Sequence, residues 1–302
     1  MVQALILAGG RGTRLRPLTD LYPKPLLYLP GGTLLDHLLN QLERLAITDI
    51  AIVVNYKADA IARHIRKRRH IRLIQQKGPA TFMAALASAA DWVQGPTLVL
   101  HGDNYFGQWL EPYVRRATPG RNTFFVSQDA AFGDTAARMA QTGAYILQPE
   151  IFRWARMLVE HDSLQALTYE IVARNAPMQI LPTNICRFNV NEPSDLLHIT
   201  HLMLRDWSSM VHPPYANLLY DPMMLSWKAR DAVVEESSLG LYVTIGHGAH
   251  VRRSRLRHAL VFPHTHVEDE EEEFVILAES RRVRIQMYVP MPHLMMPVAV
   301  AP

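Results

Sequence analysis

The chain has 302 residues, of which 49% are hydrophobic and 20% are charged. This is ordinary globular usage, so the chain can bury a core and is not disordered overall. A net charge of +3 is too small to indicate nucleic-acid binding by itself. The single cysteine, Cys186, excludes an internal disulfide framework and a zinc site of several thiolates. The sequence has neither an apolar run of the roughly 18 residues that span a bilayer nor a basic leader. We therefore expect a cytoplasmic protein with no membrane or nucleic-acid partner.

Apolar runs and helical patterns alternate through the first part of the chain. The first run is as apolar as a strand that is buried on both faces. Strands that alternate with helices predict an α/β fold with a mostly parallel sheet, whose ligand sites lie beyond the carboxyl ends of the strands. The predicted order is strand 3–8, helix 34–45, strand 50–54, helix 58–69, strand 71–75, helix 81–92 and strand 97–100.

The composition changes after residue 205. Prolines and methionines with little periodicity predict a linker at 206–232. Aliphatic residues then recur every six positions, which is typical of a left-handed parallel β-helix with about three coils at 233–290. A few ordinary hairpins are the alternative. We expect a solvated loop at the acidic run 268–273 and an apolar tail at 291–302. The repeat is carried by Val233, Leu239, Ile245 and Val251, and after a register slip by Val261 and Val267.

Two motifs follow predicted strands, where ligands bind in such sheets. The first reads G-G-R-G-T-R-L-R-P-L-T at 9–19, followed by P-K-P at 23–25. Glycines after a buried strand let backbone N–H groups approach a phosphate. The motif lacks both G-x-G-x-x-G and G-K-[ST], which disfavours a nicotinamide fold and a Walker loop. The second motif is Gly102-Asp103-Asn104, whose carboxylate is a reasonable magnesium ligand.

The first motif resembles the fingerprint of the sugar-1-phosphate nucleotidylyltransferases, G-x-G-T-R followed by P-L-T and P-K-P. The resemblance extends through most of 1–205, and six-residue repeats are a common appendage in that family. It implies a Rossmann-like nucleotidyltransferase domain at 1–205 with a mostly parallel mixed sheet. It also implies a magnesium-dependent reaction of a nucleoside triphosphate with a sugar 1-phosphate, which yields a nucleotide-sugar and pyrophosphate.

The same resemblance implies roles for individual residues. Arg14 and Lys24 would hold the triphosphate from opposite sides and stabilise developing charge. Asp103 would hold Mg²⁺. The family's second ligand is an aspartate in a stretch like D-x-G-T-P-x-D-L, which here reads N-V-N-E-P-S-D-L at 189–196. Asn189 and Asn191 are both candidates, and Asp195 is better explained as a helix cap. The nucleotide would contact Gly9, Gly10, Gly12, Thr13, Gln76 and Gly78.

The base and sugar sides depart from the family pattern. Gln76 before a glycine turn favours a pyrimidine weakly, but Pro79 removes a backbone donor from that turn. Gly143, in a Thr-Gly-x-Tyr strand, and Glu170 are candidate sugar contacts. The Glu-Lys-Pro segment whose lysine meets the sugar phosphate in the family is missing upstream of Gly143, and Arg138 is the nearest cation that could replace it.

Several functions are compatible with these residues. The first is an enzyme that uses dTTP or UTP, with a guanylyltransferase acting on mannose 1-phosphate as an alternative. The second is a pyrophosphorylase-like binding or regulatory subunit that has lost catalysis, as the missing segment, Pro79 and the asparagine ligands suggest. A third is a bifunctional enzyme with an acyltransferase in the β-helix. We interpret that module instead as a means of assembly or regulation, and we expect a homo-oligomer.

Overall fold

The computed structural model describes residues 2–127, 140–207, 210 and 219–286, and its core is a seven-stranded sheet. Strand β9 is antiparallel to both of its neighbours, and the other neighbouring pairs are parallel. The expected α/β fold with a mixed sheet is therefore confirmed. The strand order is β10 (Met178–Thr183), β8 (Asn122–Ser127), β9 (Ala140–Leu147), β6 (Thr97–His101), β1 (Gln3–Ala8), β4 (Ile50–Val54) and β5 (Ile71–Gln75).

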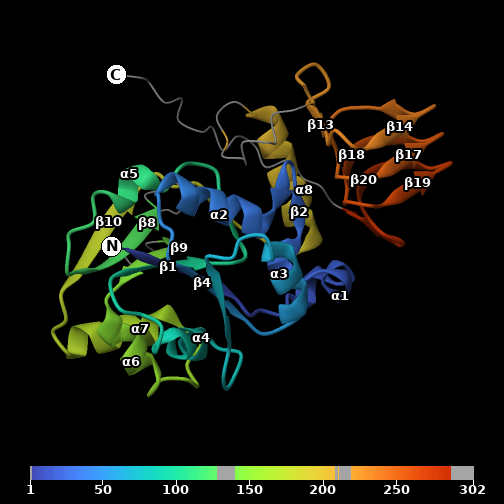
Figure 1. The fold of residues 1–302 in the computed structure, drawn as a ribbon. Helices are drawn as coiled ribbons and strands as arrows, with labels where there is room; N and C mark the ends of the chain where they lie inside the picture. Colours follow the sequence, from blue (N-terminus) through green and yellow to red (C-terminus); the bar gives the residue numbers. More distant parts are fainter. Residues whose placement is uncertain (1, 128–139, 208–209, 211–218, 287–302) are drawn as a thin grey trace, which may run out of the picture.

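Helices cover both faces of this sheet, so its central strands are buried on both sides (Figure 1). In β1, Ala4 and Ile6 face one helix layer and Leu5 faces the other, as the alternation of a strand requires. This explains why the first strand reads as a continuous apolar run. One layer holds α2 (Leu34–Arg44), α3 (Ala58–Ile65) and α5 (Glu111–Val114), and the other holds α4 (Phe82–Ala89), α6 (Pro149–Ala155) and α7 (Leu164–Ala173).

Helix α3 ends at Ile65, four residues before its predicted end. Its buried residues are Ile61 and Ile65, and no apolar residue follows until Ile71. The segment 66–69 consists of four consecutive cations, whose mutual repulsion disfavours another helical turn. Arg68 turns back instead and pairs with Asp36 at 3.3 Å.

The C-terminal strands form parallel stacks, drawn in orange and red in Figure 1. The register partners Val234, Val251 and Val267 repeat at intervals of 17 and 16 residues, so each coil is slightly shorter than three six-residue steps. One stack is β14 (Val233–Glu235), β17 (His250–Arg252) and β19 (His266–Glu268). A second is β13 (Ser226–Lys228), β16 (Val243–Ile245) and the later parts of β18 (Arg255–Val261) and β20 (Glu271–Ala278), and a third joins β15 (Ser238–Leu239) to the earlier parts of β18 and β20.

The structure corrects three details of the predicted repeat. Val234 rather than Val233 packs against the core, and Val233 is 36% exposed. The stack begins with β13, inside the segment predicted as a linker. Antiparallel strands border the stack, β12 (Tyr220–Asp221) beside β13 and β21 (Arg281–Arg284) beside β20. The predicted tail at 291–302 lies outside the described residues.

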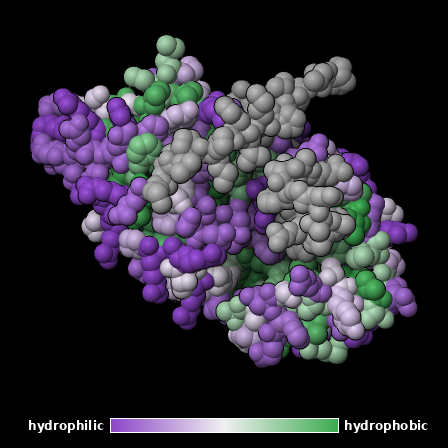
Figure 2. All heavy atoms as spheres, turned by 180° about the vertical axis from the view of Figure 1, so that it is seen from behind, coloured by the Kyte–Doolittle hydropathy of each residue, from purple (hydrophilic) through white to green (hydrophobic). Residues whose placement is uncertain are grey.

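The acidic run 268–273 is not a free loop but part of β19, a turn and β20. Glu272 is 5% exposed and pairs with Arg282 and Arg284 at 2.8 and 2.7 Å. Arg253 pairs with both Glu268 and Asp269. Figure 2 shows the resulting hydrophilic outer surface of the stacked strands at its upper left. The charges therefore cross-link successive coils.

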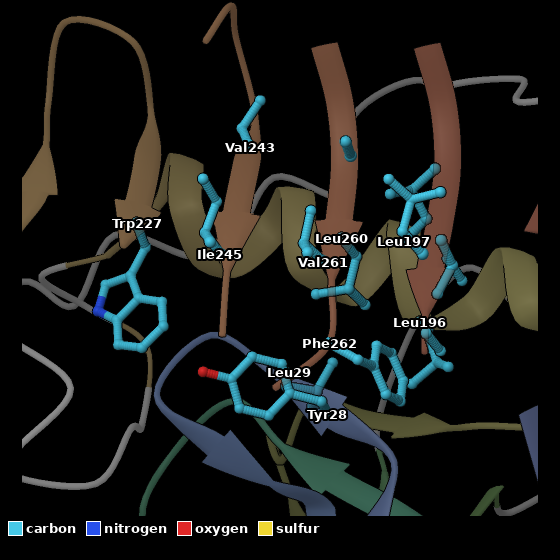
Figure 3. Close-up of a cluster of buried hydrophobic side chains, with 14 of the residues drawn as sticks. Tyr28, Leu29, Leu196, Leu197, Trp227, Val243, Ile245, Leu260, Val261 and Phe262 are labelled. Atoms are coloured by element: carbon cyan, nitrogen blue, oxygen red, sulfur yellow. The ribbon is translucent and has the colours of Figure 1, made fainter. Parts of the chain in front are cut away.

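The stacked strands and the α/β domain share one hydrophobic core (Figure 3). The hairpin of β2 (Tyr28–Leu29) and β3 (Gly32–Thr33) projects from the domain, and α8 (Pro193–Arg205) lies beside it. The Tyr28 ring stands 6.0 Å from that of Phe262 and 6.4 Å from that of Trp227. The segment 206–232 therefore does not separate two independent units. In the described part of the chain, no helix is long and apolar enough to cross a lipid bilayer.

Candidate active site

The glycine loop connects β1 to three short helices, η1 (Thr13–Leu15), α1 (Leu18–Leu21) and η2 (Lys24–Leu26). Gly12 has a φ of +61°, which glycine adopts without steric cost. The Thr19 hydroxyl donates a hydrogen bond of 2.8 Å to the Gly12 carbonyl and ties the loop to α1. A Cβ at Gly10 would have no atom within 4 Å, so this part of the loop is open. Arg11, Thr13 and Arg14 are exposed around it.

Gln76 lies directly against the glycine loop. A Cβ at Gly9 would clash with Gln76 Oε1, so a larger residue at this position would force the Gln76 amide to shift. Gln76 is 9% exposed, and its Nε2 donates to the carbonyl oxygens of Pro79 at 2.8 Å and Thr81 at 3.3 Å. The turn at Gly78 has a φ of +79° and open space around it. The structure thus brings the predicted base-reading residue to the predicted phosphate loop.

Lys24 and Asp103 bring the two sequence motifs together. Lys24 Nζ donates to Asp103 Oδ2 at 2.7 Å, and Lys24 is only 9% exposed. Asp103 follows β6, and the Gly102 N–H bonds to the Leu7 carbonyl of β1 at 2.9 Å. A Cβ at Gly102 would stand 2.7 Å from that carbonyl oxygen, so glycine is needed where the two strands end together. A cation and a carboxylate therefore meet at the carboxyl ends of adjacent strands.

The two candidate asparagines have different surroundings. Asn191 Oδ1 accepts a hydrogen bond from Arg14 Nη2 at 3.0 Å. Asn189 lies in β11 (Arg187–Asn189), directly opposite Asn104 of β7 (Asn104–Phe106) and so beside Asp103. Its Oδ1 is buried and accepts no hydrogen bond from the described residues. Asp195 accepts from the backbone N–H groups of Asn191 at 2.7 Å and Glu192 at 2.9 Å, which confirms it as a cap of α8.

Unpartnered polar groups also gather at Gly143 on β9. Gly143 has a φ of +70°, and a Cβ there would clash with Asn104 Nδ2. Asn104 is 1% exposed, yet neither its Nδ2 nor its Oδ1 has a hydrogen-bond partner among the described residues. The nearby His101 Nε2 is also buried without one, and its ring stands 5.7 Å from that of Tyr145. Buried polar atoms without partners mark a place where a ligand can supply them.

His101 is held in its neutral form. Burial lowers its pKa, the charges of Arg187 and Lys24 act in the same direction, and the charge of Asp103 opposes them. A neutral imidazole here avoids placing another cation beside Lys24.

The structure does not join two other predicted sugar-side residues, Glu170 and Arg138, to this cluster. Glu170 lies on α7 and pairs with Arg174 at 2.9 Å, and the guanidinium of Arg174 stands over the Trp154 ring. Its contact with a sugar therefore stays a prediction. Arg138 lies outside the described residues.

Sequence reasoning missed three residues of this region, His101, Asn104 and Arg187. Asn104 was visible in the Gly-Asp-Asn motif, and a polar residue following a buried strand was a usable signal. Arg187 gave no such signal, because only the pairing of β7 with β11 brings it here.

The glycine loop and the Lys24–Asp103 ion pair thus lie together at the carboxyl ends of parallel strands, where α/β proteins bind their ligands. Residues 3–131, which include both motifs, match the family model described as nucleotidyl transferase. A putative glucose-1-phosphate thymidylyltransferase from Bacillus anthracis, solved in complex with a sucrose, has a similar fold. Its TM-score is 0.55 at 17% identity, over 65% of this chain and 92% of that one.

Three relatives align with different shares of the chain, from 38% to 73%. The bifunctional protein GlmU of Methanocaldococcus jannaschii is 32% identical over 38% of this chain and 28% of that protein. The UTP–glucose-1-phosphate uridylyltransferase AglF of Haloferax volcanii is 33% identical over 43% of this chain and 53% of that protein. The mannose-1-phosphate guanyltransferase of Emericella nidulans is 25% identical over 73% of this chain and 72% of that protein. The chain thus spans about half of the length of the uridylyltransferase and less than a third of the length of GlmU.

Proposed function

We propose that this chain transfers a nucleotidyl group from a nucleoside triphosphate to a sugar 1-phosphate. The observation that carries the proposal is the 2.7 Å pair of Lys24 and Asp103 beside the open glycine loop. The nucleotidyl transferase family model, which covers this loop and Asp103, supports it. The similarity to a glucose-1-phosphate uridylyltransferase and a mannose-1-phosphate guanyltransferase also supports it.

In this reaction a phosphate oxygen of the sugar 1-phosphate attacks the α-phosphorus of the triphosphate. The new P–O bond forms as the bond from the α-phosphorus to the bridging oxygen of the β-phosphate breaks, and pyrophosphate leaves with that electron pair. No covalent enzyme intermediate is required, so the protein positions two anions and stabilises the added charge. Lys24 and Arg14 would supply positive charge, and the glycine loop would supply backbone N–H groups.

The donor set at 103 and 189 fits a magnesium ion. Mg²⁺ prefers oxygen ligands and is usually bound through one or two protein groups together with substrate phosphates and water. Asp103 offers a carboxylate, and the buried Asn189 Oδ1 has no other hydrogen-bond partner among the described residues. The described residues contain no group of three His, Cys, Asp or Glu side chains that could hold a metal ion, so most ligands of the ion would come from substrate phosphates and water. When bound, the ion would neutralise phosphate charge, and Asn189 rather than Asn191 would complete its site.

The surroundings of Gln76 favour UTP or dTTP. Because its Nε2 donates to Pro79 and Thr81, Oε1 is the atom of this amide left to accept a hydrogen bond. Uracil and thymine present an N3–H donor that such an acceptor can bind, whereas cytosine presents an acceptor at that position.

Two alternatives have support of their own. Guanine also presents an N–H donor, and the alignment with the mannose-1-phosphate guanyltransferase includes more of this chain than that with the uridylyltransferase. A guanylyltransferase acting on mannose 1-phosphate is therefore the second candidate. A catalytically inactive binding subunit is the third, because Pro79 and the uncharged Asn189 both weaken the family pattern.

A substrate panel separates these candidates. Pure protein with Mg²⁺ is incubated with each of UTP, dTTP, GTP, CTP and ATP, paired with glucose, mannose or N-acetylglucosamine 1-phosphate, and pyrophosphate is measured. Release with UTP or dTTP supports the first proposal, and release with GTP and mannose 1-phosphate supports the second. Calorimetric binding of a nucleotide without any release of pyrophosphate indicates the inactive subunit.

For the C-terminal strands we propose a left-handed parallel β-helix that serves assembly. The parallel stacks with coils of 16 or 17 residues support the β-helix. Ion pairs between successive coils on the outer surface support it as well. Light scattering on the intact chain tests the assembly role. A whole multiple of the chain mass supports a homo-oligomer, and a monomer at micromolar concentration contradicts it.

A further inference from the structure

We infer that Arg187 is the cation that binds the phosphate of the sugar 1-phosphate. This inference rests on the proposed function and extends it to a residue outside the glycine loop. It addresses a specific gap, because the sequence has no lysine between 128 and 141, where the resembled family places one.

The register of β7 and β11 places Arg187 at the edge of the site. Asn189 lies directly opposite Asn104, and side chains of opposed residues in an antiparallel pair share a face. Arg187 is two residues from Asn189 and therefore lies on that same face. This is the face on which Asn104 reaches Gly143. Arg187, Asn189 and Asn104 thus border one side of the site.

The electrostatics of the site agree with that placement. Burial raises the pKa of Tyr145, and the positive charge of Arg187 acts in the opposite direction. A Cβ at Gly143 would stand 3.7 Å from His101 Cγ, and the His101 ring stands 5.7 Å from that of Tyr145, so both rings lie beside Gly143 on β9. The charge of Arg187 therefore acts on the part of β9 that contains Gly143.

The Arg187 side chain is also available to a ligand. It is exposed and forms no ion pair or hydrogen bond with any residue that the structure describes. Lys24 is already paired with Asp103, and Arg14 bonds to Asn191. A phosphate carrying close to two negative charges needs a positive partner on the sugar side, and a guanidinium binds phosphate oxygens in bidentate fashion.

The test compares Arg187→Met and Arg187→Lys with the matched control Arg72→Met, an exposed arginine on the edge strand β5. Pyrophosphate release is measured with the best substrate pair from the panel. We expect Arg187→Met to raise KM for the sugar 1-phosphate at least tenfold while KM for the triphosphate changes less than twofold. Arg187→Lys should recover part of the loss, and Arg72→Met should match wild type. Equal effects on both substrates, or no effect, would overturn the inference.

A binding measurement keeps this test separate from the proposed function. If wild type releases no pyrophosphate with any pair, the proposed transfer fails, but calorimetry with glucose, mannose and N-acetylglucosamine 1-phosphate still examines Arg187. We then expect wild type to bind at least one sugar 1-phosphate tenfold more tightly than the matching free sugar, and Arg187→Met to lose that preference. Absence of any preference for the phosphorylated sugar in wild type, or its persistence in Arg187→Met with unchanged thermal unfolding, would refute the role.

Discussion

Lys24 and Asp103 are 79 residues apart in the sequence, and their ion pair is the contact on which the candidate site depends. Each alone has an ordinary structural explanation, as a surface lysine or a strand-end carboxylate. Together, with Lys24 buried to 9% exposure, they form a preorganised charge arrangement beside a loop open to phosphate. Preorganised groups of this kind typically change reaction rates by about 10²–10³ each.

The close contact between Gly9 and Gln76 leads to a prediction about stability. Gly9→Ala places a methyl group against Gln76 Oε1, so the buried amide must move away from its two carbonyl partners. We expect a loss of about 1–3 kcal/mol in the free energy of unfolding. Gly10→Ala, whose methyl group points into open space, should change stability by no more than about 0.5 kcal/mol. Urea unfolding measures both, and equal losses would contradict this account of the loop.

At the scale of elements, α8 joins the site to the stacked strands. Its N-terminal cap orders Asn191, which bonds to Arg14, while His201 on the same helix packs against aromatic rings of the C-terminal coils. Tyr242 directly precedes β16, and His258 and Phe274 lie within β18 and β20. All three have positive φ angles, and their rings stack at 5.4 and 4.5 Å. The His201 ring lies 4.6 Å from Tyr242 and 5.0 Å from His258.

The buried position of His201 makes the stability of the protein depend on pH. Burial lowers the pKa of His201 to about 3, and the charges of His258 and His198 act in the same direction. The unfolded chain therefore binds a proton below about pH 6.5 that the folded chain does not, and stability falls as pH decreases from about 6.5 toward 3. The slope from His201 approaches about 1.4 kcal/mol per pH unit.

Replacing His201 with phenylalanine isolates its share of this effect. His201→Phe keeps a ring against Tyr242 and removes the titrating group, so the variant should lose less stability than wild type between pH 7 and pH 4.5. Chemical denaturation at several pH values measures the difference. Parallel curves for the two proteins would show that His201 does not carry the pH dependence.

Most of the sheet was predictable from the sequence, because its strands are apolar runs of the length that a buried parallel strand requires. The strands at 3–8, 50–54 and 71–75 match the observed β1, β4 and β5. The helix at 58–69 was predicted too long because charge repulsion and the lack of apolar residues after Ile65 outweighed helical propensity.

The candidate site was only partly predictable. The glycine loop and Asp103 follow strands, so their meeting follows from parallel topology. The choice between Asn189 and Asn191, and the presence of Arg187, depend on the pairing of β7 with β11. Such pairing is long-range and leaves no local pattern, because β11 is three residues long with mixed polarity.

At the scale of the whole molecule, we expect the shared core to make the chain unfold as one cooperative unit. Phe262, 1% exposed, packs its ring against Tyr28 and Tyr22 of the α/β domain, and the Tyr22 hydroxyl donates to Glu279 at 3.0 Å. Removal of residues 233–290 would expose this core rather than release a separate module.

Phe262→Ala tests this cooperativity. We expect a loss of about 3–5 kcal/mol, as for other buried aromatic residues, with a single unfolding transition for both parts. Met223→Ala, at a site 85% exposed, is the control and should change stability little. Scanning calorimetry would contradict a shared core if it resolved a separate transition for the stacked strands that alone shifts in Phe262→Ala.

The most direct test of the account is the effect of Asp103→Asn on pyrophosphate release, measured across a Mg²⁺ titration with the best substrate pair. Asp91→Asn, at an 88% exposed side chain, is the matched control. If Asp103 shares the nucleotide's cation, the rate should fall at least about a hundredfold in Asp103→Asn and stay at the wild-type level in the control. A wild-type rate and an unchanged Mg²⁺ requirement in Asp103→Asn would contradict it.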